Sequence, residues 1–204
     1  SLSFGTKDKT KQRIAAELSS ILAFSALKNN DKVGLILFTD RIEKFVPPRK
    51  GKSHVLRIIR EVLSFEPEGN KTNLKGALEF LNHTIKKRCI LFVISDFFDT
   101  GYDKILKVVG RKHDLIGIVL NDRREKELPA MGLVKFRDAE SGEVAIIDTS
   151  SQMVQDWFSR RLKDQSDYRK TVFRASKLDM VEITTEESYI RPLVDFFKLR
   201  EKRW

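Results

Sequence analysis

The sequence predicts an α/β domain in which a mostly parallel β-sheet is flanked by helices on both faces. Segments with apolar residues at three-to-four spacing alternate with short, nearly all-apolar runs, and this alternation is typical of parallel strands covered by helices. The chain has 204 residues, of which 41% are hydrophobic, which is sufficient for one buried core. We therefore expect a single domain over residues 1–204.

The first part of the chain predicts three helices and one strand hairpin. Each helix has an apolar stripe bounded by capping or terminating residues, and each strand is a short apolar run that ends in polar residues. In chain order these elements are a helix over residues 9–29, strands over 33–38 and 42–46, and helices over 53–64 and 74–86. Thr72 and Asn73 are both suitable to cap the last of these helices.

The second part predicts parallel strands joined by helices, with one hairpin appended to the sheet. Its elements in chain order are strands over 89–95, 114–120 and 180–184, and helices over 102–112, 151–176 and the segment after Thr185. Two further runs, 132–138 and 143–148, flank a turn sequence and predict an antiparallel hairpin. The packing candidates of the long helix over 151–176 include Met153, Trp157 and Phe173.

The charge and the single cysteine limit the function classes. A net charge of +10 suits an acidic protein, a phospholipid surface or nucleic acid as partner. The basic runs lie on different predicted elements without interleaved aromatic residues, which favours a solvated surface over a nucleic-acid site. No apolar run reaches the roughly 18 to 20 residues of a membrane-spanning helix. Cys89 lies alone in an apolar run, which indicates a reducing compartment, and we expect a cytoplasmic protein.

Oxygen-bearing side chains occur where the strands of the predicted sheet end. Asp96 directly follows a central strand, Thr72 precedes a helix, and Ser1 and Ser3 precede the first helix. Ligands of open parallel sheets bind outside the carboxyl ends of the strands. Hydroxyl groups with one carboxylate form a hard-oxygen site that suits Mg²⁺. We therefore predict that Ser1, Ser3, Thr72 and Asp96 are metal ligands.

These residues also resemble the three parts of a metal-ion-dependent adhesion site in a von Willebrand A domain. The parts are Ser1-Leu2-Ser3, the threonine loop at 69–74 and Ile94-Ser95-Asp96. Segments 31–38, 45–51 and 91–97 resemble, more specifically, the bacterial domain-of-unknown-function 58 family, and this likeness covers nearly the whole chain.

The resemblance implies a von Willebrand A-like, Rossmann-like fold and a protein-interaction function. It implies that Thr72, Asp96 and an N-terminal serine bind the ion, and that an acidic side chain of the partner completes the coordination. It further implies a partner of the MoxR-type AAA+ ATPase class, and a role in assembling or activating other complexes at the inner face of the cytoplasmic membrane.

The sequence departs from the family pattern at its start. The adhesion motif reads Asp-x-Ser-x-Ser at the end of the first strand, and this chain begins within that motif. We therefore expect an N-terminally truncated domain that lacks most of its first strand and binds Mg²⁺ weakly or not at all. The unfilled position in the sheet would be closed by a second copy of the chain or by local rearrangement.

Two other function classes stay open, although we expect no enzyme. The sequence contains no Gly-x-Ser-x-Gly elbow and no phosphate-binding glycine-rich loop after a strand. The first alternative is a Mg²⁺-dependent phosphoester hydrolase that uses Asp40, Asp96 and Asp99, and the second is a basic nucleic-acid-binding domain. A zinc site is not expected, because the three histidines lack metal-ligand spacing.

Overall fold

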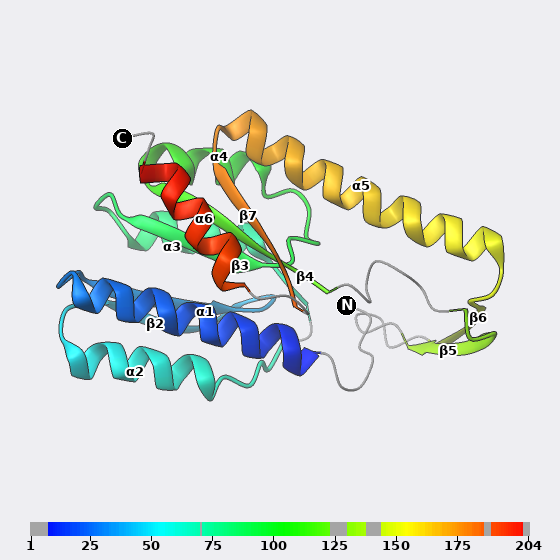
Figure 1. The fold of residues 1–204 in the computed structure, drawn as a ribbon, viewed down its shortest axis with the longest axis horizontal. Helices are drawn as coiled ribbons and strands as arrows, with labels where there is room; N and C mark the ends of the chain where they lie inside the picture. The colour runs from blue at the N-terminus through cyan, green and yellow to red at the C-terminus, as the bar shows by residue number, and fades with distance from the viewer. Residues whose placement is uncertain (1–7, 70, 123–129, 138–143, 186–188, 202–204) are drawn as a thin grey trace. The chain divides into compact units, whose positions relative to one another are not determined.

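The computed structural model describes residues 8–69, 71–122, 130–137, 144–185 and 189–201, which form two compact units (Figure 1). The first unit ends at Thr84 and the second begins at Ile85. Each unit has its own strands and its own covering helices.

The first unit is an antiparallel hairpin with helices on both faces. Its elements are α1 (Asp8–Lys28), β1 (Val33–Phe38), β2 (Ile42–Arg49), α2 (Lys52–Leu63) and α3 (Leu74–Thr84). The predicted hairpin is confirmed, but β2 continues beyond the predicted end at Val46, because Arg49 still pairs with Val33. The register shifts between Val33 and Leu35, and this irregularity lets the strand accommodate two prolines.

Successive side chains of β1 and β2 point to opposite faces of the hairpin, and each face contacts different helices. Leu35 is opposite Val46, and both belong to the core that the hairpin forms with α1 and α2. Ile36 is opposite Phe45, and the Phe45 ring contacts Phe80 of α3 edge-on, with the ring centroids 5.4 Å apart. The hairpin is therefore covered by α1 and α2 on one face and by α3 on the other.

The second unit is a three-stranded parallel sheet with an additional antiparallel hairpin. The parallel sheet has the order β3-β4-β7, so β4 is central, and the hairpin pairs β5 with β6. Its elements are β3 (Ile90–Ser95), α4 (Asp103–Lys112), β4 (Asp114–Asn121), β5 (Leu133–Arg137), β6 (Val144–Asp148), α5 (Gln152–Ser176), β7 (Asp179–Thr184) and α6 (Ile190–Glu201). The predicted parallel strands and the predicted hairpin are both confirmed. Among the described residues, however, the hairpin is a two-stranded sheet of its own and is not paired with the parallel sheet to which we expected it to be appended.

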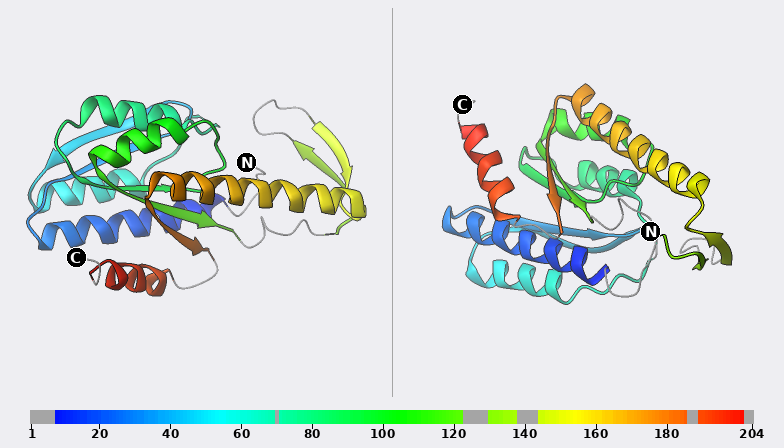
Figure 2. Two further views of the ribbon diagram at one scale, coloured as in Figure 1. Left: turned by 90° about the horizontal axis from the view of Figure 1, so that it is seen from above. Right: turned by 45° about the vertical axis from the view of Figure 1, so that its right-hand side comes forward.

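Helices cover both faces of this parallel sheet. On one face, Gly117 of β4 lies so close to α5 that a Cβ atom there would fall 2.6 Å from Cε1 of Phe173. On the other face, Phe92 of β3 contacts Phe197 of α6, with the ring centroids 6.1 Å apart. Figure 2 shows α4 and α5 on one side of the sheet and α6 on the other. Only a glycine at position 117 lets the Phe173 ring reach the strand.

The long helix α5 packs through its carboxyl-terminal half. Arg169, Val172 and Phe173 are its buried residues. Met153 and Trp157, which we expected to pack, are 80% and 56% exposed. The apolar stripe of this helix therefore continues into solvent. In the described part of the chain, no helix is both long and apolar enough to cross a membrane.

Candidate functional site

The predicted metal ligands fall in three places. Ser1 and Ser3 lie outside the described residues. Thr72 is exposed in the loop before α3 of the first unit, and Asp96 is half-buried directly after β3 of the second unit. Thr72 and Asp96 therefore belong to different units.

In the first unit, the cap of α3 is Asn73 and not Thr72. The Asn73 side chain accepts a hydrogen bond from the Gly76 backbone N–H through Oδ1 at 2.8 Å, which is the bond of an N-cap residue. The Asn73 backbone N–H donates to the Thr39 carbonyl at 2.8 Å. These two bonds fix the loop next to Thr72 without using the Thr72 hydroxyl.

A buried carboxylate, Glu43 of β2, holds the start of the same loop. Its Oε1 lies 2.7 Å from the Thr39 hydroxyl and 3.1 Å from the Gly69 backbone N–H, and both donate to it. The Thr39 bond, supported by Gly69 and by the Arg41 charge, holds the pKa of Glu43 below its usual value. Gly69 has no room for a Cβ atom, which would fall 2.9 Å from Cβ of Thr39. The sequence did not reveal this role, because a lone glutamate in a strand is usually solvated.

In the second unit, the backbone after β3 turns sharply at Asp96. Phe97 adopts a left-handed conformation with φ 56°, which is uncommon for a bulky residue, and its side chain is only 1% exposed. The Ser95 hydroxyl accepts from the Phe97 N–H at 3.1 Å, and Asp96 Oδ1 accepts from the Phe98 N–H at 3.3 Å. The strained turn is held by burial of the Phe97 ring, so Asp96 has a defined position at the strand end.

Arg169 of α5 is a buried cation that supports the same turn. It is 3% exposed, its Nη1 donates to the Asp96 carbonyl at 3.1 Å, and its Nη2 donates to Glu182 Oε1 of β7 at 3.4 Å. Its Nε is buried without a hydrogen-bond partner among the described residues. Arg169 therefore links α5 to the turn after β3 and to β7. The sequence did not single it out among the many basic residues of α5.

A second carboxylate, Asp122, lies at the carboxyl end of the central strand β4. It is 5% exposed and directly follows β4, whose Val119 is paired with Ser95 of β3. Asp122 and Asp96 therefore end neighbouring parallel strands. The sequence signal was present, because Asp122 follows an apolar run in the same way as Asp96 does, but we did not predict Asp122 as a site residue.

The donors at this edge suit a hard divalent cation. Asp96 accepts a backbone hydrogen bond through Oδ1, and its carboxylate is the type of oxygen ligand that a hard cation takes. Asp99, two residues after Phe97, accepts from the Thr100 N–H at 2.7 Å and forms the rim of a pocket. Carboxylate, hydroxyl and water oxygens are the ligands that Mg²⁺ prefers.

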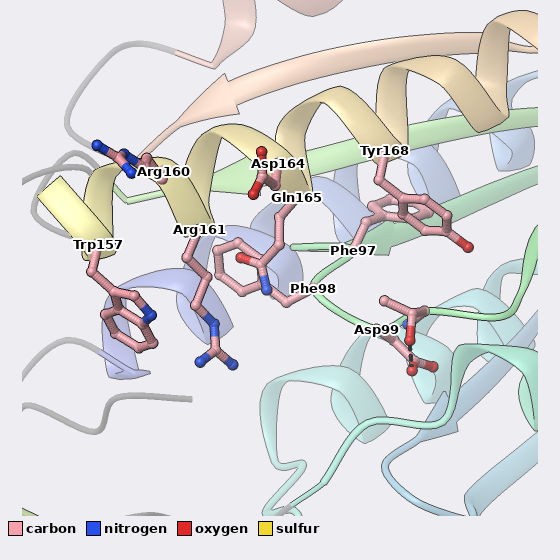
Figure 3. A pocket seen from close by; sticks show the side chains of 10 residues that line it. Phe97, Phe98, Asp99, Trp157, Arg160, Arg161, Asp164, Gln165 and Tyr168 are labelled. Atoms are coloured by element: carbon pink, nitrogen blue, oxygen red, sulfur yellow. Dashed lines mark hydrogen bonds between the residues drawn. The ribbon is translucent and has the colours of Figure 1, made fainter.

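A pocket of about 660 Å³ lies beside this turn (Figure 3). Its walls are residues 97–100 and one face of α5 between Trp157 and Tyr168. The Tyr168 hydroxyl accepts from the Gly101 N–H at 3.0 Å and joins the two walls at one end. The pocket and the turn at Asp96 are therefore parts of one surface.

At the opposite end of the sheet, His113 is buried beside Cys89. His113 is 2% exposed, its Nδ1 lies 3.4 Å from the Cys89 sulfur, and its Nε2 has no partner among the described residues. Burial, supported by the Lys112 charge, lowers the pKa of His113 below its ordinary value of 6.5. Burial also raises the pKa of the Cys89 thiol. Both side chains are therefore neutral near neutral pH.

We expect His113 to make the protein less stable as the pH falls below about 6.5. The folded state keeps the ring neutral while the unfolded state binds a proton, so stability falls between the ordinary pKa and the lowered folded pKa. Urea unfolding at about pH 7.5 and about pH 5.5 measures the effect, and His113→Gln should reduce the difference between the two. An equal difference in both proteins would show that other groups cause it.

Comparisons with known proteins agree with this α/β fold. A family model described as "Protein of unknown function DUF58" matches residues 1–168. The uncharacterized protein Rv1480 of Mycobacterium tuberculosis is 24% identical over 205 residues, which cover 99% of this chain and 64% of that protein. The chain thus spans less than two thirds of that relative. The uncharacterized protein MAV169 of Mycobacterium avium is 25% identical over 160 residues, covering 77% of this chain and 94% of that protein.

A solved structure supports the fold alone. The conserved hypothetical protein BatB from Bacteroides thetaiotaomicron superposes with a TM-score of 0.54 at 15% sequence identity. The superposition covers 93% of this chain and 87% of that chain. At this identity the likeness concerns the arrangement of strands and helices and not the function.

Proposed function

The chain belongs to the DUF58 family, and we propose that it is a protein-interaction module of the von Willebrand A type rather than an enzyme. In this proposal Asp96 and Thr72, together with Ser1 or Ser3, bind Mg²⁺, and an acidic side chain of the partner occupies the remaining coordination position. The observation that carries the proposal is the fixed position of Asp96 at the end of a parallel strand, where Phe97 and Arg169 hold the backbone.

The family resemblance supports a MoxR-type AAA+ ATPase as the partner. It also supports a cytoplasmic location near the inner face of the membrane. An acidic docking residue on the partner agrees with the net charge of +10 on this chain, because a positive field attracts an acidic surface and accelerates association. When bound, the ion would supply the local positive charge that the partner carboxylate recognises.

The proposal predicts that Asp96→Ala weakens partner binding about tenfold or more, and that a chelator has the same effect on the wild-type protein. The measurement is the affinity of the full-length protein for a purified MoxR-type ATPase, with Mg²⁺ and with EDTA. The matched control is Asp167→Ala, which removes an exposed carboxylate from α5 and should leave the affinity unchanged.

Two outcomes would contradict this function. The first is binding that depends neither on Asp96 nor on the metal ion. The second is Mg²⁺-dependent hydrolysis of a phosphoester such as p-nitrophenyl phosphate that is lost in Asp96→Ala and in Asp99→Ala, because that result would favour the hydrolase alternative.

A further inference from the structure

We propose that the pocket between α5 and residues 97–100 is a second contact site for the same partner, and that it binds a segment with an acidic side chain next to a large apolar one. The inference rests on the proposed interaction function and specifies the chemistry of the partner. It concerns the second unit alone, in which both walls of the pocket lie.

Aromatic side chains line much of the pocket. Trp157, Arg161, Gln165 and Tyr168 lie on successive turns of α5 and form one stripe along the pocket (Figure 3). Phe98 comes from the opposite wall. Trp157 is 56% exposed, so a large part of its apolar surface is not covered by the protein itself. The volume of about 660 Å³ is sufficient for a large apolar side chain and its neighbour.

Two arginines give one wall of the pocket positive charge. Arg160 and Arg161 are both exposed, and in the part of the chain that the structure describes neither forms an ion pair. The Arg161 guanidinium lies 5.4 Å from the centre of the Trp157 ring, which holds it beside the aromatic surface. Each guanidinium can bind a carboxylate with two parallel hydrogen bonds.

Carboxylates in the pocket walls favour an acidic peptide over a nucleic acid as the occupant. Asp99 and Asp164 also line the pocket, so a phosphate backbone would meet two carboxylates there. A single carboxylate can pair with one arginine while its apolar neighbour packs on Trp157. The mixed charge of the walls therefore favours a protein segment over a polynucleotide.

The pocket lies next to Asp96, so one partner can contact both. Residue 97 of the pocket wall directly follows Asp96, the predicted metal ligand. A partner that presents one acidic residue at Asp96 can place an adjoining segment in the pocket. Two linked contacts bind more tightly than either alone, because the second forms at high effective concentration.

The experiment selects a display library of random short peptides on the protein in the presence of EDTA. Selected peptides are resynthesised with phenylalanine in place of any tryptophan and titrated into Trp204→Phe, in which Trp157 is the remaining tryptophan of two. We expect peptides that combine Asp or Glu with Phe, Trp or Leu, and that change the emission of Trp157.

Two double variants locate the binding site. Arg160→Ala with Arg161→Ala should weaken peptide binding about tenfold or more. Lys170→Ala with Arg174→Ala removes the same charge from exposed positions of the same helix outside the pocket, and it should leave binding unchanged. Both double variants replace exposed side chains, so their melting temperatures should equal that of the parent protein.

Three results would overturn the pocket site: no enriched peptide, equal binding by both double variants, or tighter binding of oligo(dT) than of any peptide at the same Trp157 surface. Because the peptides are tested in EDTA, the result does not depend on the metal ion. If the ATPase still binds through Asp96 while the peptides fail, the pocket inference alone is wrong.

Discussion

Replacing Arg169 by alanine is expected to destabilise the protein by about 3 kcal/mol and to weaken partner binding through Asp96. The change removes a buried guanidinium that donates to the Asp96 carbonyl and to Glu182. It takes this donor from the Asp96 carbonyl and leaves an empty volume between α5 and the sheet. The loss stays below that of a fully buried ion pair, because the Glu182 side chain is 38% exposed and can be rehydrated.

Arg169→Met separates the contribution of packing from that of the hydrogen bonds. Methionine fills much of the same volume and does not carry the buried Nε that has no partner in Arg169. The Arg169→Met protein should therefore lose clearly less stability than the Arg169→Ala protein. It should still weaken partner binding, since the Asp96 carbonyl loses its donor in both variants. Urea unfolding and the ATPase affinity measure the two effects, with exposed Arg174→Ala as the control. If both Arg169 variants bound the partner with normal affinity, Arg169 would not be needed to position Asp96 for binding.

Replacing Phe97 by alanine is expected to cost about 3 to 4 kcal/mol of unfolding free energy. The Phe97 ring is 1% exposed and contacts Phe173 and Tyr102, with centroid distances of 5.3 Å and 6.0 Å. Its loss leaves a cavity over Gly117, where a Cβ atom would lie 3.4 Å from the Phe97 ring. Alanine also keeps the unfavourable left-handed backbone without the packing that stabilises it.

The control for Phe97 is its neighbour Phe98. Phe98 is only half-buried and lines the open pocket, so Phe98→Ala should cost less than half as much stability. Thermal and urea unfolding compare the two variants under the same conditions. If Phe98→Ala were the more damaging change, the buried ring of Phe97 would not be what holds the turn.

Local sequence patterns predicted the elements of this fold well. Helices such as α2 and strands such as β4 follow from the spacing of apolar residues, which is a property of neighbouring positions. The same patterns placed Asp96 directly after β3, because the apolar run of the strand ends there. The end of β2 was predicted too early, because the pairing partner of Arg49 is Val33, a residue of the preceding strand.

The supporting residues of the site could not be predicted in this way. Whether Arg169 and Glu43 are buried depends on partners at Asp96 and Gly69, which lie 73 and 26 positions away in the chain. A charged residue in a helix or strand is usually solvated, so the local sequence does not predict a buried, supporting role for Arg169 or Glu43. The metal ligands Ser1, Ser3, Thr72 and Asp96, the ATPase partner and the closure of the sheet by a second copy stay predictions.

The sequence by itself therefore determined the order of helices and strands, the parallel character of the sheet and the position of Asp96 at a strand end. These features depend on the spacing of apolar residues along one segment. The tertiary structure alone decided that Phe97 is strained and buried, that Arg169 supports the turn, and that α5 forms a pocket with residues 97–100. These features depend on contacts between segments that are distant in the chain, and such contacts form only when α5 packs on the sheet.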